Sequence, residues 1–275
     1  MLEISESYVI SRQLNETIAG KIIMNVTANA TPHSFAWYFG DPGNYHALLA
    51  GKRIDTAQPV GGNVEICAGN MKILLGDGVN IRYFKQGDKL PAKHQLHIEF
   101  DDASALVCSV QMYGGLWVFA DGQNDNPYYL IALRKPSPLS TDFTKQYFTE
   151  LFEAESAKKL SAKAFLATEQ RIPGLGNGVL QDILYNAKIH PKRKIADFSR
   201  KETDELYDVL VSTLKTMTEK GGRDTEKDLY GNKGSYQTVL SRNTVGKPCP
   251  ACGSIIRKEA YLGGSIYFCD KCQTQ

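Results

Sequence analysis

The sequence lacks any long apolar run. No stretch approaches the roughly 20 residues of a membrane-spanning helix, and the opening MLEISESYVI lacks the basic start of a signal peptide. A Ser/His/Asp array, a phosphate-binding P-loop and a carboxylate cluster spaced for a divalent metal are missing too. We therefore expect a protein of a reducing, bacterial-type cytoplasm or nucleoid, with no membrane partner and no small-molecule cofactor.

A strong charge of either sign is also lacking. The 275 residues carry a net charge of only +2. Residues 1–140 hold 11 Lys and Arg against 13 Asp and Glu, which leaves 21 against 17 for residues 141–275. This slight basic excess fits an ordinary surface as well as a nucleic-acid contact. With 42% hydrophobic residues, the chain can build two domains and a small additional module.

Cysteines are few, but four of the six form the most specific pattern in the chain. Cys249 and Cys252 are followed, sixteen residues later, by Cys269 and Cys272. Each C-x2-C pair places two thiolates on one tight turn, and two facing turns complete the tetrahedron of soft ligands that structural Zn²⁺ takes. A redox pair or two disulfides are the alternatives. We expect one structural zinc per chain, with no open position for catalysis.

The first 135 residues have the pattern of a β-sandwich. A helix is expected from Ser5 to Ile18, where apolar residues recur at helical spacing, and Gly20 ends it. Alternating or apolar runs follow, separated by turn signals such as Gly76–Gly78, and typify a β-sandwich or barrel. The expected strands are 21–28, 34–39, 63–67, 72–75, 80–84, 95–100, 105–113 and 116–120.

The second half changes to the helical period, so the fold class is α+β with several domains. A stiff linker is expected at residues 136–142, which contain Pro136 and Pro138. A helical domain, residues 143–240, follows with apolar faces at 143–152, 162–167, 179–187 and 206–217. Within it, the glycine-rich segment 221–234 is expected to be a mobile loop. Residues 245–275 form the cysteine ribbon, a β-hairpin.

A glycine turn separates the second and third helical faces. Gly174-Leu175-Gly176-Asn177 enters a helix, and such a turn exposes N–H groups at the positive end of the helix dipole, where a phosphate can bind. Asn177 is expected to cap this helix and to offer its amide outward. Taken alone, such a turn is more often a simple bend. Four cations between residues 188 and 194, close to the same helix pair, favour the phosphate interpretation.

These motifs together resemble one known family. Residues 165–191 look like the helix–two-turn–helix module of the formamidopyrimidine-DNA glycosylase and endonuclease VIII family. The terminal C-x2-C-x16-C-x2-C ribbon, preceded by Gly246-Lys247-Pro248, is similar to that family's zinc finger. The opening residues Met1–Glu6 align with its N-terminal Pro-Glu-Leu-Pro-Glu. The three matches lie in the family's order along the whole chain. They imply a glycosylase-like N-terminal domain and a monomeric base-excision-repair enzyme that binds damaged or abasic double-stranded DNA.

The resemblance also implies a mechanism. In the family, the N-terminal amine attacks C1′ of a damaged nucleoside, forms a Schiff base, expels the base and nicks the strand. An α-amine has a pKa near roughly 8, so part of it is nucleophilic near neutral pH. Glu3 takes the position of the family's catalytic carboxylate, and Glu6 that of the second acid. Two glutamates in a helix's first turn would, however, also satisfy its dipole without any catalysis.

Several positions depart from the family's pattern. The family's nucleophilic proline is replaced by Leu2, and a bulky second residue hinders methionine removal, so the chain is expected to begin at Met1. By alignment, a phosphate-binding lysine falls near Asn63, and the ribbon arginine that clamps a phosphate falls on Gly264. The arginine that fills the gap left by a flipped base falls on Gln111.

Other strand residues have two interpretations each. Gln111 and Tyr113 are expected to plug and wedge the duplex, or else simply to alternate in a strand. Tyr83 would replace an intercalating methionine, or be a partly buried strand aromatic. Arg82 is either a DNA contact or a solvated strand cation. DNA-binding residues are thus expected at Gly174, Gly176, Asn177, Arg82, Tyr83, Gln111 and Tyr113.

Three functions follow from these matches and departures. The leading one is a DNA glycosylase with AP-lyase activity, which Glu3 and the Gly174–Asn177 turn favour. The second is a homologue that binds damaged or abasic DNA with weak or lost catalysis, which Leu2, Asn63 and Gly264 favour. The third is an interaction scaffold in which the zinc ribbon is only a structural staple. A scaffold should show no preference for damaged duplex and no steep salt dependence.

Overall fold

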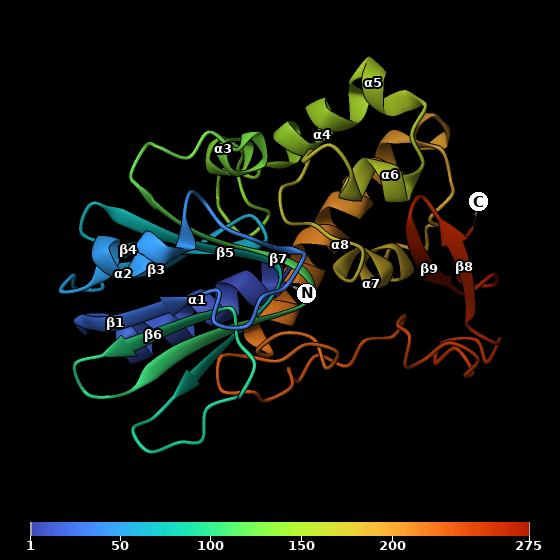
Figure 1. The fold of residues 1–275 in the computed structure, drawn as a ribbon. Coiled ribbons are helices and arrows are strands. Elements are labelled where there is room, and N and C mark those ends of the chain that lie inside the picture. The colour runs from blue at the N-terminus through green and yellow to red at the C-terminus, as the bar shows by residue number, and fades with distance from the viewer. Residues whose placement is uncertain (1, 275) are drawn as a thin grey trace.

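The computed structural model describes residues 2–274 as a β-rich domain, a helical domain and a small C-terminal ribbon (Figure 1). The helices are α1 (Ile4–Ile18), α2 (Tyr45–Leu49), α3 (Pro127–Arg134), α4 (Lys145–Glu153), α5 (Glu155–Lys158), α6 (Ala162–Ala167), α7 (Val179–Asn186) and α8 (Arg200–Glu219). Two short 3-10 turns are η1 (Pro42–Asn44) and η2 (Ile195–Asp197). No helix in this part of the chain is long and apolar enough to cross a membrane.

The N-terminal domain is built on one curved sheet with the strand order β1-β6-β7-β5-β4-β3, and β2 adds to β7 in parallel. All the other pairings are antiparallel. The sheet folds over on itself, so its two halves face each other across an apolar core (Figure 1). The strands are β1 (Ile23–Ala28), β2 (Ala36–Trp37), β3 (Thr56–Val60), β4 (Asn63–Ala68), β5 (Met71–Phe84), β6 (Leu96–Phe100) and β7 (Ala105–Ala120).

The expected α+β class is confirmed, with local corrections. Gly76–Gly78 does not separate two strands, because β5 and β7 each run straight through two of the expected strands. The turn signal instead marks a register shift between Asp77 and Val79, where Asp77 has a φ of 58°. Strand β3 and helices α2 and α3 were not expected from the pattern. The Pro127 start of α3 and its Asn126 cap are visible in the sequence only once the helix is known.

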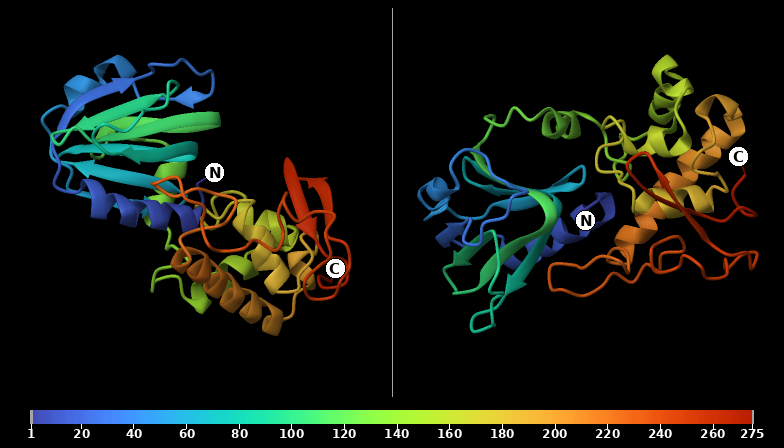
Figure 2. Two further views of the ribbon diagram at one scale, coloured as in Figure 1. Left: turned by 90° about the horizontal axis from the view of Figure 1, so that it is seen from below. Right: turned by 45° about the vertical axis from the view of Figure 1, so that its right-hand side comes forward.

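Helix α1 links the two domains. Its residues Ile10, Leu14 and Ile18 belong to the core of the β domain, while Ile4 at its first turn is buried in the core of the helical domain. The helix ends at Gly20, whose φ of 85° favours glycine. The start of α1 therefore lies where the two domains meet (Figure 2).

The helical domain packs around α8, whose N-terminus has a complete capping box between Ser199 and Glu202. Its aromatic core joins Phe148, Phe152 and Phe165, with ring centroids 4.9 to 5.9 Å apart. The C-terminal ribbon consists of β8 (Arg257–Tyr261) and β9 (Gly264–Phe268) as an antiparallel hairpin. It lies against α7 at the far end of the helical domain from the β sheet (Figure 1, Figure 2).

Candidate functional site

The four ribbon cysteines converge on one point. The ligand atoms of Cys249, Cys252, Cys269 and Cys272 all lie within 4.8 Å of one another. The closest sulfur pairs are 3.4 and 3.7 Å apart, far beyond the roughly 2.05 Å of a disulfide. The hydroxyl of Tyr185 lies 3.1 Å from the Cys249 sulfur and can donate to a thiolate there. This set of soft donors fits a tetrahedral metal ion.

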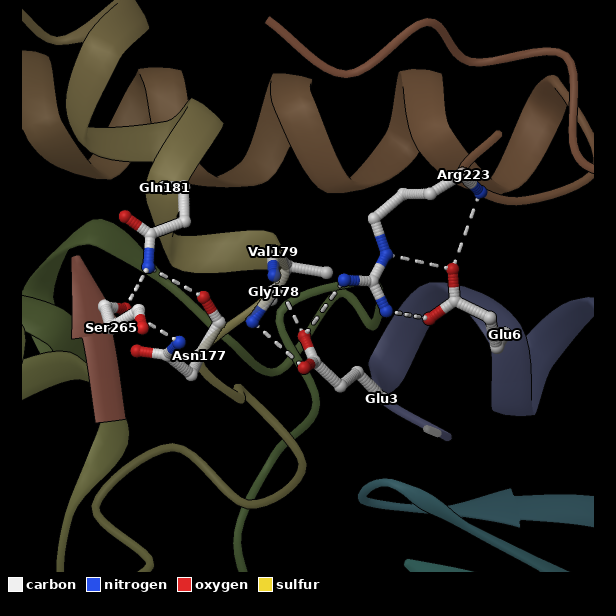
Figure 3. Close-up of polar contacts among 8 residues, drawn as sticks. All are labelled: Glu3, Glu6, Asn177, Gly178, Val179, Gln181, Arg223 and Ser265. Atoms are coloured by element: carbon white, nitrogen blue, oxygen red, sulfur yellow. Dashed lines mark hydrogen bonds and ion pairs between the residues drawn. The ribbon is translucent and has the colours of Figure 1, made fainter. Parts of the chain in front are cut away.

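The second cluster forms at the N-terminus, around the carboxylate of Glu3. One carboxylate oxygen accepts the N–H of Gly178 at 2.8 Å, and the other accepts the N–H of Val179 at 2.7 Å (Figure 3). These are the free N–H groups at the start of α7, so Glu3 neutralises that helix terminus from 175 residues away. Glu3 is 4% exposed. Met1 lies outside the described residues.

Arg223 joins Glu3 to Glu6. Its guanidinium donates to both carboxylate oxygens of Glu6, at 3.0 and 2.7 Å, and lies 3.5 Å from Glu3. All three side chains are buried (Figure 3). Burial raises the pKa of Glu3 despite the opposing charge of Arg223. For Glu6, burial alone would raise the pKa, but the charge and hydrogen bonds of Arg223 lower it. The two carboxyls are thereby driven apart in acidity.

The glycines before α7 allow the domains to approach closely. Gly174 has a φ of 79°, and a Cβ there would lie 2.1 Å from the backbone nitrogen of Gly62. A Cβ on Gly176 would lie 2.6 Å from the Glu3 carboxyl carbon. The backbone N–H of Ile4 also donates to the Gly174 carbonyl at 3.0 Å. The turn thus packs closely against the N-terminal segment and hydrogen-bonds to it, a role that the sequence did not suggest.

Asn177 has a different role from the expected cap. Its amide group donates to the carbonyl of Ser265 in the ribbon at 2.9 Å (Figure 3). Gln181 donates to the same carbonyl at 3.2 Å. The cap position belongs to Gly178, and Glu3 takes the helix N–H groups. The prediction that Asn177 caps α7 was therefore wrong, because a carboxylate far along the chain competes better for those donors.

A cleft of about 540 Å³ opens beside Glu3, between the two domains. Of the predicted site residues, the cleft brings together Leu2, Glu3, Gly174, Gly176 and Tyr113. Aromatic rings form much of its remaining wall, from Trp37, Trp117, Tyr128 and Tyr129. The backbone N–H of Leu2 donates to the Asp77 carbonyl at 2.9 Å, and the Leu2 side chain is buried.

The other predicted residues lie elsewhere. Gln111 is exposed on β7, next to Met112, which is 69% exposed. Arg82 is half-buried and donates to the carbonyl of Asp228 at 2.8 Å, and the hydroxyl of Tyr83 accepts from Lys21 at 2.9 Å. The Arg82 side chain thus joins β5 to the segment 221–234, the Tyr83 hydroxyl joins it to Lys21 after α1, and neither residue lines the cleft. Their assignment as DNA contacts gains no support from this position.

Sequence reasoning missed two residues of the site. Asp77 lines the cleft, and burial raises its pKa. Its only sequence signal was a Gly-Asp-Gly triplet that indicated a turn. Arg223 lies in the segment 221–234, which was expected to be a mobile loop. In the structure its side chain binds Glu6 and so connects this segment to α1. The only sequence signal was an arginine between glycines and acidic residues. The local sequence could not predict a partner 217 residues away.

The fold and site define a class of protein: a β-rich domain and a helix–two-turn–helix domain that enclose an acidic N-terminus, with a C-terminal four-cysteine ribbon. Residues 135–228 match the family description "Formamidopyrimidine-DNA glycosylase H2TH domain". A formamidopyrimidine-DNA glycosylase of Prochlorococcus marinus is 30% identical over 200 residues, covering 70% of this chain and 67% of that protein. One of Symbiobacterium thermophilum is 29% identical, covering 99% and 89%.

Solved structures agree on the fold. The Lactococcus lactis protein Fpg (MutM), in complex with DNA containing N7-benzyl-Fapy-dG, superposes with a TM-score of 0.84 at 22% identity. The match covers 99% of this chain and all of that one. The Thermus thermophilus MutM (Fpg) protein gives 0.80 at 22% identity, with 98% of both chains covered. The chain belongs to the formamidopyrimidine-DNA glycosylase and endonuclease VIII family.

Proposed function

We propose that this protein is a DNA glycosylase and AP lyase that acts on damaged bases in duplex DNA through a Schiff base with its N-terminal amine. The observation that carries the proposal is the position of Glu3, buried between the start of α1 and the N-terminus of α7, with the interdomain cleft beside it. The relatives are named as DNA glycosylases, and a Lactococcus lactis relative has been solved on DNA containing an abasic site.

The chemistry follows from an amine and a carboxyl at one place. The amine attacks C1′ of the damaged nucleoside, the bond from C1′ to the base breaks, and the base departs with a proton. The C1′–O4′ bond of the sugar ring then breaks as O4′ takes up a proton, which leaves a ring-opened iminium ion. The iminium makes the C2′ proton acidic, and its removal expels the 3′ phosphate, which nicks the strand. Each stage requires a group that takes up and returns protons beside the amine.

Glu3 is the better candidate for that proton carrier. Its pKa is raised by burial, toward the range in which a carboxyl exchanges protons near neutral pH. Glu6 has the opposite character, because Arg223 lowers its pKa and binds both of its oxygens. We assign Glu6 the role of a fixed anion that holds Arg223, which in turn fixes the position of Glu3.

The ribbon is proposed to hold one structural zinc. Cys249, Cys252, Cys269 and Cys272 would supply all four ligands, and the metal would order a hairpin too small to fold by hydrophobic burial alone. A metal that stabilises the ribbon would also set the position of Ser265, which binds Asn177 and Gln181 at the start of α7. The metal thus supports DNA binding without taking part in the reaction.

A second function has specific support: a protein that binds damaged or abasic DNA with weak or lost catalysis. The Leu2 side chain is 8% exposed and packs in the core of the β domain, where the family has its proline. With Met1 retained, the nucleophile is a primary amine one residue further out than the family places it. A misplacement of about 1 Å can cost on the order of 100-fold in rate.

Borohydride trapping on an abasic-site duplex separates the two functions. Borohydride reduces the imine, so only a Schiff-base enzyme becomes covalently linked to DNA. We expect trapping by the wild type and its loss in Glu3→Gln, with unchanged binding to a duplex carrying a tetrahydrofuran abasic analogue. Binding without any trapping, even after long incubation at several pH values, would establish the second function and overturn the first.

A further inference from the structure

One buried cation in the helical domain has no counter-ion. Lys163, on α6, is 4% exposed. Its ammonium donates to the backbone carbonyl of Tyr261 in the ribbon and lies 5.9 Å from the Tyr261 ring. No carboxylate of the described residues pairs with it. Lys192, whose ammonium lies 5.5 Å from the same ring, is paired with Glu259.

An unpaired charge at such a position is costly. A buried ammonium loses its hydration, and one neutral carbonyl replaces only part of it. Burial accordingly lowers the pKa of Lys163. Natural proteins seldom keep an isolated buried lysine for packing alone, because a methionine of similar shape would fill the space without this cost. An anion that arrives from outside the chain would remove the cost.

Gly264 of the ribbon lies beside the Lys163 ammonium. At Gly264, the first residue of β9, a Cβ would lie 3.4 Å from the Lys163 ammonium and 3.7 Å from the Asn177 side-chain oxygen. Both groups therefore face the side-chain position that is empty at Gly264. The Asn177 oxygen is buried without a hydrogen-bond partner. Polar groups from α6 and from the turn before α7 thus converge on a position that this chain leaves unsatisfied.

A rotation of the Asn177 side chain away from Ser265 would present its NH2 group to an anion. The Ser265 carbonyl would not be left alone by that change, because Gln181 also donates to it. Lys163 and Asn177 then offer an ammonium and an amide donor from neighbouring elements, a combination that suits a phosphate oxygen.

We propose that Lys163 binds a backbone phosphate of the DNA, together with Asn177, at the space left open by Gly264. This inference rests on the proposed function, since it presumes that DNA lies along the turn 174–177 and the ribbon. It assigns the cation to α6, whereas the family resemblance locates a phosphate-binding arginine at the ribbon position that is glycine here. The contact positions the duplex and reads no base.

The test compares the affinities of variants for an abasic-analogue duplex and an undamaged duplex. Lys163→Met should weaken binding to both by about tenfold, the scale of one hydrogen bond to a charged group. It should also reduce the slope of log affinity against log salt by about 0.9, the value for one phosphate contact. Lys192→Met is the matched control, because its charge is already paired, and it should change neither quantity.

A second pair of variants keeps the inference testable if Lys163→Met fails to fold. Gly264→Glu would supply an internal carboxylate to the ammonium, so it should raise the melting temperature and weaken DNA binding. Gly264→Gln has the same size without the charge and should not raise the melting temperature. In a Lys163→Met background, Gly264→Glu should lose its stabilising effect.

Two results would overturn the inference. One is an unchanged affinity and salt slope in Lys163→Met while the wild type binds the abasic duplex. The other is equal behaviour of Gly264→Glu and Gly264→Gln in both stability and binding. A wild type that binds neither duplex better than an unrelated protein would instead refute the proposed function itself, and the melting comparison at Gly264 would still report on the ammonium.

Discussion

Two buried cations in this protein have opposite surroundings. Arg223 lies between two carboxylates, and its hydrogen bonds to Glu6 are 3.0 and 2.7 Å long. Lys163 lies against one carbonyl of the ribbon, with a neighbouring asparagine oxygen that has no partner. The first cluster is complete within the folded chain. The second is incomplete. The complete cluster fixes the positions of Glu3 and Glu6, whereas the incomplete one is where we propose that an external anion binds.

The contrast extends to the N-terminus of α7. Glu3 satisfies the helix N-terminus from inside the protein, so that terminus is not free for a phosphate. Our proposal therefore leaves the phosphate contact to Asn177, Lys163 and the ribbon. The carboxylate proposed for catalysis and the groups proposed to hold the DNA backbone then lie on separate sides of one turn. Variants on either side should have separable effects on trapping and on binding.

The largest expected effect comes from removing the metal. This change should disrupt the ribbon next to Lys163 and leave the Arg223 cluster intact. Structural zinc contributes on the order of 10 kcal/mol to folding of small zinc modules. Cys269→Ala should lower the metal content from one per chain to near zero and abolish tight DNA binding. The helical core should still melt cooperatively, because Arg223 and its carboxylates lie outside the ribbon. Elemental analysis and circular dichroism check this, and one metal per chain in the variant would contradict it.

Next in size is the loss of Arg223, which breaks the complete cluster. Arg223→Met leaves Glu3 and Glu6 buried without a counter-ion, so the free energy of unfolding should fall by about 3–5 kcal/mol. Denaturant unfolding measures it. Lys163→Met is the matched control and should be neutral or stabilising, since it removes an unpaired charge. Adding Glu6→Gln to Arg223→Met should recover part of the loss. If Arg223→Met and Lys163→Met lower the free energy of unfolding equally, the two cations do not differ in how well the folded chain satisfies them.

The two clusters were not equally visible in the sequence. Cysteine spacing predicted the ribbon because ligand geometry fixes it locally, and the end of α1 followed from Gly20. Glu3 and Glu6 were found by position in a resemblance. Arg223 was misjudged as part of a mobile loop, since its partners come from the other end of the chain. Lys163 was hidden inside the apolar stretch Ala162–Ala167, where a lone lysine reads as a helix surface residue.

The strand errors have a similar origin. Periodicity marks which residues face the core, but it does not tell whether a Gly-Asp-Gly triplet ends a strand or bends it. Opposite Gly76–Gly78 the register shifts: Asp77 pairs with Gly114 and Val79 with Val110, so the extra residues lie in β7, while β5 continues through the irregularity. That bend carries Asp77 to the cleft and to the backbone of Leu2. Long-range pairing, which no local pattern encodes, thus decided the part of the sheet nearest the site.

A third buried charge sharpens the comparison, because its hydrogen-bond partners are backbone N–H groups and the Tyr236 hydroxyl, with no ion pair among the described residues. Asp182 on α7 is 1% exposed and accepts the N–H groups of Val239 and Leu240 at 2.9 and 2.7 Å. Burial raises its pKa to about 6, against the opposing effect of those N–H groups. Between about pH 4 and 6 the folded protein therefore keeps a proton that the unfolded chain has released, so stability should fall as pH rises through this window.

The expected loss is at most about 3 kcal/mol, the equivalent of roughly two pKa units. Unfolding free energies measured at pH 4 and pH 6.5 for the wild type and for Asp182→Asn give the size of this effect. The decline should be smaller in the variant, which has no proton to release at this position. If both proteins lose the same stability, the pKa of Asp182 lies near its usual value and its two amide donors compensate for burial.

The smallest expected effect belongs to Asn177, which lies between the two clusters. Asn177→Ala removes one donor to the Ser265 carbonyl and, by our proposal, one donor to a phosphate, so DNA affinity should fall by about 1–2 kcal/mol. The loss should be the same on abasic and undamaged duplexes, because a phosphate contact carries no sequence information. Gln181→Ala is the matched control, since it removes the contacts with Ser265 and Tyr267 of the ribbon and with the Asn177 backbone, and no proposed phosphate contact. A loss as large in Gln181→Ala would mean that Asn177 acts by positioning the ribbon. A loss confined to Asn177→Ala, and absent when Lys163→Met is already present, would place both side chains on one phosphate.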